Sequence, residues 1–105
     1  MTVGEWLHTR EPRPPAALAA RLDAVLGDAL AESDGEIPTL FLAAGERLVA
    51  NLLQSNSTSR DSALDLLTAD ALVTYAFEAE STTTESISAR AALAMTRIAA
   101  LGVRT

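Results

Sequence analysis

The sequence contains no cysteine and a single histidine, His8. Without cysteine the chain has no disulfide bond, no thiolate nucleophile and no cysteine-based zinc site. One histidine is too few for a di-iron bundle, which takes Glu-x-x-His pairs from two helices. His8 has no fixed carboxylate or nucleophile beside it in the sequence, so we interpret it as a surface or packing residue rather than a general base. We therefore predict no catalytic residue, no metal and no cofactor.

Lysine is also absent, and eight arginines stand against fourteen acidic residues, which gives a net charge of −6. The exclusive use of arginine, with abundant alanine and leucine, is typical of a GC-rich bacterial genome. Nucleic-acid binders meet phosphate with a basic surface, so we expect no nucleic-acid partner. No apolar run reaches the ~20 residues of a membrane span, and no basic-then-apolar leader begins the chain. We expect a cytoplasmic protein without a membrane partner.

Aromatic residues make up only 4% of the 105 residues, although 49% are hydrophobic. That hydrophobic fraction is too high for a disordered chain, and the length fits one compact domain. Strand-like alternation and hairpin turn signals are absent from the sequence. We predict an all-α fold, a small bundle of four main helices preceded by a short N-terminal helical arm. Residues 1–15 form the arm and a proline-rich linker in this prediction, and residues 16–105 form the helical bundle domain.

The first three helices are predicted from caps, prolines and apolar spacing. A capping-box pattern over residues 2–5 starts the arm, and the prolines of residues 12–15 end it. Leu18 and Leu22 belong to the apolar stripe of a second helix, which we expect to end at residues 33–35. A third helix begins at Pro38 and ends before a polar loop over residues 54–59. Gly45 costs about 1 kcal/mol inside this helix, which favours close approach of a neighbouring helix there.

The fourth helix, predicted over residues 61–79, has two apolar sides instead of one. The first side contains Leu64, Leu67, Ala71 and Tyr75, and the second contains Leu66, Ala69, Val73 and Phe77. Such a helix is either central in its own bundle or buries its second side on a partner. A capping-box pattern over residues 82–85 predicts the start of a fifth helix. Its apolar seam has 4-3-4-3 spacing and consists of Ile87, Ala91, Ala94, Ile98 and Leu101.

Charged residues on these helices are interpreted mainly as structural. Asp61 and Asp65 lie four residues apart and could both reach one cation, but we expect them to serve capping and solubility. Asp70 borders both apolar sides, so we expect it to be partly buried and paired with Arg90, Arg97 or a hydroxyl. The arginines at 90, 97 and 104 recur every seven residues and could clamp an anion. We expect them to face acidic residues across a helix interface.

The thin, alanine-rich interior favours a protein that gains stability by associating. We predict a non-catalytic protein that acts through protein–protein association, as a homodimer or an accessory subunit. Trp6 either caps its own bundle or anchors a second chain. The candidate interface residues are Trp6, Leu66, Val73, Phe77, Ile87 and Ile98.

Three other functions remain open at this stage. A small apolar ligand could occupy a cavity near Phe41, Tyr75 and Phe77, with Gly45 at its flank. The second possible function is that of an enzyme or metal protein that uses the carboxylates. The third is that of an accessory subunit that docks on a larger complex through the Trp6 arm.

Overall fold

The computed structural model describes residues 1–55 and 58–103, and the side chains of residues 83–86, 90, 102 and 103 lie outside that description. Its elements are α1 (Val3–His8), α2 (Ala16–Leu26), the 3-10 helices η1 (Gly27–Ala31) and η2 (Asp34–Glu36), α3 (Ile37–Ser55) and α4 (Arg60–Val103). Within the described residues there is no strand, only an isolated bridge between Thr2 and Ser33. The all-α prediction, a small helical bundle that begins with a short helix, is confirmed.

Local sequence signals account for the beginning of α1 and the end of α2. The Thr2 hydroxyl accepts a hydrogen bond from the Glu5 amide, and the Glu5 carboxylate accepts one from the Thr2 amide. The hydrogen bond from the Thr2 amide above all, and then hydrogen bonding between the Thr2 hydroxyl and the carboxylate, lower the pKa of Glu5. The α2 helix ends at Leu26, earlier than predicted, because Gly27 adopts a φ of +50°, which glycine tolerates without a Cβ clash. Gly27 therefore ends this helix, a role for which the sequence had suggested Gly35.

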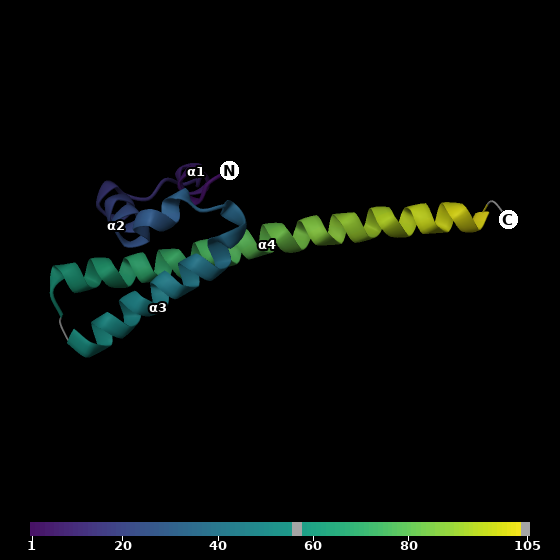
Figure 1. Ribbon diagram of the computed structural model, residues 1–105. Helices are drawn as coiled ribbons and strands as arrows, with labels where there is room; N and C mark the ends of the chain where they lie inside the picture. Colours follow the sequence, from purple (N-terminus) through teal and green to yellow (C-terminus); the bar gives the residue numbers. More distant parts are fainter. Residues whose placement is uncertain (56–57, 104–105) are drawn as a thin grey trace.

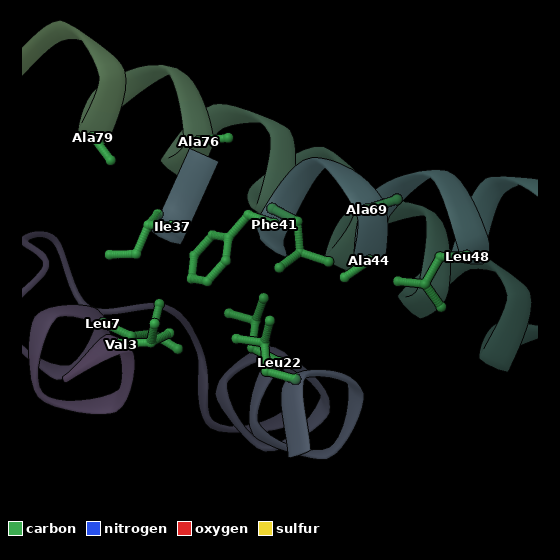
Figure 2. Packing of buried hydrophobic residues seen from close by; sticks show 12 residues of the cluster. Val3, Leu7, Leu22, Ile37, Phe41, Ala44, Leu48, Ala69, Ala76 and Ala79 are labelled. Carbon is green, nitrogen blue, oxygen red and sulfur yellow. The ribbon is translucent and has the colours of Figure 1, made fainter. Parts of the chain in front are cut away.

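The α3 and α4 helices run side by side as an antiparallel hairpin, and α1 and α2 lie together over one side of it (Figure 1). Ser59 caps α4, because its hydroxyl accepts a hydrogen bond from the Ser62 amide at 3.2 Å. Figure 2 shows the core where the helices meet, with the ring of Phe41 at its centre. The largest fully buried side chains come from each of the α-helices α1 to α4: Val3, Leu22, Ile37, Phe41, Thr68 and Leu72.

The buried face of α4 is centred on Thr68 and Leu72, which belong to neither of the two predicted apolar sides. Leu72 is fully buried, and so is Thr68, whose hydroxyl donates to the Leu64 carbonyl at 2.8 Å. A threonine satisfied by its own helix can be buried at little cost, so it does not mark a polar boundary. The two predicted apolar sides consequently flank the buried face, and each is only partly covered, since Leu66, Leu67 and Phe77 are 60%, 58% and 65% exposed.

The predicted break at residues 82–85 is wrong, because α4 continues through it as a single helix of 44 residues. The Thr82 hydroxyl donates to the Glu78 carbonyl at 3.2 Å, within the helix, instead of capping a new one. Hydroxyl side chains can bond the carbonyl four residues earlier, so a capping pattern permits a helix start without enforcing it. The other members of the predicted box, Thr83 to Glu85, have side chains outside the described part. The predicted fourth and fifth helices are therefore one element.

The second half of α4 extends away from the rest of the molecule (Figure 1). The radius of gyration is 18.9 Å and the longest axis is 71 Å, whereas a compact chain of this length has a radius of gyration of about 13 Å. A helix of 44 residues is about 66 Å long, which accounts for the long axis. Among the described residues, no helix combines the length and the apolar character needed to cross a membrane.

Candidate interaction surface

The projecting segment, residues 81–101 of α4, has no neighbouring helix on its apolar seam. Ala79 is the last buried residue of α4, and every side chain described beyond it is exposed. Ile87 and Ile98 are 59% and 66% exposed. The large apolar residues exposed here are Ile87, Leu93, Met95, Ile98 and Leu101. The structure thus leaves the predicted 87–101 seam uncovered along its described length.

A shallow apolar groove between α3 and α4 has a volume of about 500 Å³. Its lining residues are Gly45, Glu46, Val49, Ala50 and Leu53 from α3, and Leu66, Ala69, Asp70 and Val73 from α4. A Cβ added to Gly45 would lie 3.4 Å from Cγ2 of Val73, which confirms the close helix approach expected at this glycine. Because Gly45 and Ala69 are small, α3 and α4 pack closely at the floor of the groove.

The groove and the projecting segment contain four of the six predicted interface residues, and a fifth lies between the two regions. Leu66 and Val73 line the groove, and Phe77 lies between the two regions and is 65% exposed. These three, with Ile87 and Ile98, occupy the a and d positions of one seven-residue repeat, since every spacing is a sum of alternating steps of three and four. The continuous α4 helix therefore places them along one face.

Sequence reasoning missed the contribution of α3 to this surface. Val49 and Leu53 are 40% and 78% exposed and form the second wall of the groove. The available signal was that apolar residues of α3 extend beyond the stripe through Phe41, Gly45 and Leu48. Only the pairing of α3 with α4 shows that this extra apolar edge lies next to Leu66.

Trp6, the sixth candidate, packs within its own chain. Its ring makes edge-to-face contacts with Phe41 and Tyr75 at centroid distances of 6.1 and 6.0 Å. The Arg10 guanidinium lies 3.9 Å above the indole and pairs with Glu78 at 2.7 Å. Burial, then the Glu78 charge, raises the pKa of Tyr75. This cluster fastens α1 to α4 through an aromatic and an ionic contact.

Phe41, Tyr75 and Phe77 do not enclose the apolar cavity that the sequence suggested. Phe41 is fully buried in the core, whereas Phe77 is exposed to solvent. Neither residue lines the groove, and Tyr75 is absent from its walls as well. The apolar pocket beside Gly45 is instead the α3/α4 groove.

The described acidic side chains are distributed over the surface and serve separate contacts. No group of three or more His, Asp or Glu side chains suited to a metal occurs in the part of the chain that the structure describes. Asp65 pairs with Arg21 of α2 at 2.6 Å, and Asp61 lies in the first turn of α4, where a carboxylate interacts favourably with the helix dipole. Asp70 is exposed at the groove, contrary to the expected partial burial.

His8 lies 3.7 Å from Asp23, between its Nε2 and a carboxylate oxygen, and both side chains are substantially exposed. This distance is too long for a hydrogen bond. The pair therefore lacks the geometry of a catalytic dyad.

Comparison with known proteins adds no family to this description. No protein-family model, no curated protein and no solved structure matches the chain.

Proposed function

We propose that the chain is a non-catalytic cytoplasmic protein that acts by associating with a second copy of itself through α4. The observation that carries this proposal is the projecting segment, about half of a 44-residue helix, with its apolar seam facing solvent. A helix of about 20 residues without tertiary contacts is only marginally stable in water. Burial of one large aliphatic side chain contributes about 1.5–3 kcal/mol. Covering the seam with another chain would therefore stabilise the helix as well as the complex.

The first test is the mass of the protein in solution by analytical ultracentrifugation across a dilution series. We expect a dimer at tens of micromolar that dissociates on dilution. The double variant Ile87→Asp/Ile98→Asp should be monomeric, because it places two charges on the seam. A wild-type chain that stays monomeric throughout the series contradicts the proposal.

The matched control places the same two charges on the opposite side of the segment. The control variant is Ala89→Asp/Thr96→Asp. Each substituted residue lies two residues from Ile87 or Ile98 in the sequence, which places it on the opposite side of the helix, where the side chains are exposed. This variant should dimerise like the wild type. Far-ultraviolet circular dichroism of both variants shows whether the body of the molecule stays folded.

A second candidate function is the binding of a small apolar molecule, which the α3/α4 groove supports. Its volume of about 500 Å³ lies within the 300–1,000 Å³ range of ligand sites. Thermal unfolding in the presence of fatty acids and other apolar metabolites tests it, since a bound ligand raises the melting temperature by mass action.

A further inference from the structure

The α3/α4 groove and the projecting segment have opposite charges. The two charged residues that line the groove, Glu46 and Asp70, are both acidic. The projecting segment contains one glutamate and two arginines, for a net charge of +1, whereas residues 1–80 contain thirteen acidic and five basic residues, for a net charge of −8. Arg97 is exposed and directly precedes Ile98 of the seam. Charge complementarity thus favours contact between the end of one chain and the body of another.

We propose that the projecting segment of one copy lies in the α3/α4 groove of a second copy, antiparallel to its α4, and that the exchange is reciprocal. This inference rests on the proposed self-association and assigns its geometry. Each chain then supplies one segment and one groove, so a single two-fold axis relates the partners and closes the assembly. Parallel docking of a segment in the groove would leave one groove and one segment free, and would extend into a filament.

The seven-residue repeat of α4 specifies a register for this arrangement. When Phe77 faces Ile87 of the partner, Leu66 faces Ile98, because both pairs are symmetric about residue 82. The small residues Ala91 and Ala94 then face Val73 and Asp70 at the floor of the groove. Large apolar residues meet each other at both ends of the contact, and alanines allow close approach in the middle.

The same register explains the placement of charge and the role of α3. Ile98 would fill the space between Leu66 of α4 and Leu53 of α3, two side chains that line the groove and are 60% and 78% exposed. Arg97 would come within about one helical turn of Asp70. By contrast, a parallel pair of projecting segments would bring together two segments that each carry a net charge of +1, and would leave the groove uncovered.

Engineered cysteines test the geometry without background, because the natural chain has none. We prepare Leu66→Cys and Ile98→Cys chains separately, mix them at tens of micromolar and oxidise them. The mixture should form a disulfide-linked heterodimer, since a disulfide needs Cα atoms within about 7 Å. Each chain alone should not link, because residues 66 and 66, or 98 and 98, are far apart in the antiparallel pair. Ala89→Cys, on the outer side of the segment, should not link to Leu66→Cys.

The outcomes separate this inference from the proposed function. Efficient linking of Ile98→Cys to itself would show that the projecting segments pair in parallel, which overturns the groove geometry and leaves the homodimer intact. If the wild-type chain dimerises but the Leu66→Cys and Ile98→Cys chains do not link to each other, the groove geometry is overturned too. A monomeric wild-type chain removes both proposals.

A charge exchange provides an independent readout. Asp70→Arg and Arg97→Asp should each raise the dissociation constant by several-fold, and the combined variant should restore it towards the wild-type value. Equal, additive losses in the combined variant would contradict the contact between these two residues.

Discussion

The two halves of α4 have the same backbone conformation but different surroundings. Residues 60–80 pack against α2 and α3 and bury Leu72 completely, whereas the described side chains of residues 81–101 are all exposed. The two halves also differ in charge, since residues 60–80 contain five acidic residues and one arginine, a net charge of −4, whereas residues 81–103 contain one glutamate and two arginines, a net charge of +1. Helical order in α4 therefore does not depend on one continuous core, and the two halves should respond differently to the same substitution.

The largest expected difference is in the free energy of unfolding that is lost when a core residue or a seam residue is replaced by alanine. Phe41→Ala should lower the free energy of unfolding by about 3–5 kcal/mol, because Phe41 is fully buried at the centre of the core. Ile98→Ala should change it by less than about 0.5 kcal/mol when the chain is monomeric, because Ile98 is exposed. Urea denaturation at low protein concentration measures both. Similar losses for the two variants would mean that the projecting segment packs on the body of its own chain.

A substitution in the groove should change the free energy of unfolding by a smaller amount and in the opposite direction. Gly45→Ala should raise the free energy of unfolding by up to about 1 kcal/mol, since alanine is the better helix former. The added methyl group would meet Val73 and Ala69 at 3.4 and 3.6 Å, close to ordinary van der Waals contact. Urea denaturation again provides the measurement, with Ala50→Gly on the exposed side of α3 as the reciprocal control. A loss of stability on Gly45→Ala would show that α3 and α4 are too closely packed to admit a methyl group.

The smallest effect concerns pH and the cluster that joins α1 to α4. Burial raises the pKa of Tyr75 above the ordinary value of about 10, so the folded state favours the neutral phenol. Its contribution to stability is complete below about pH 10 and falls as the pH rises through the raised pKa. Tyrosinate absorbance reports this group alone, because the chain has one tyrosine. Stability falls at alkaline pH, and the Tyr75→Phe variant should lack the part of this fall that comes from ionisation of Tyr75. If the variant loses as much stability as the wild type, groups other than Tyr75 cause the fall.

Much of the fold followed from residues whose signal is local. The capping pattern at Thr2 and Glu5, the apolar stripe through Leu22 and the close approach at Gly45 all appear in the structure. The end of α2 at Gly27 and the continuity of α4 at Thr82 did not follow, because glycine and threonine are each compatible with two local conformations. The candidate surface was predicted on α4, while its α3 wall depended on a contact between distant segments.

The sequence by itself determined that the chain is helical and that apolar residues recur at coiled-coil spacing along residues 87–101. Those properties depend on side chains three or four residues apart, which interact within a single helix. Only the tertiary structure decided that α3 accompanies the first half of α4 and not the second, which leaves a groove beside one half and an uncovered seam on the other. That choice depends on how α1, α2 and α3 fill the space around Phe41, and contacts across the chain, not local spacing, determine it.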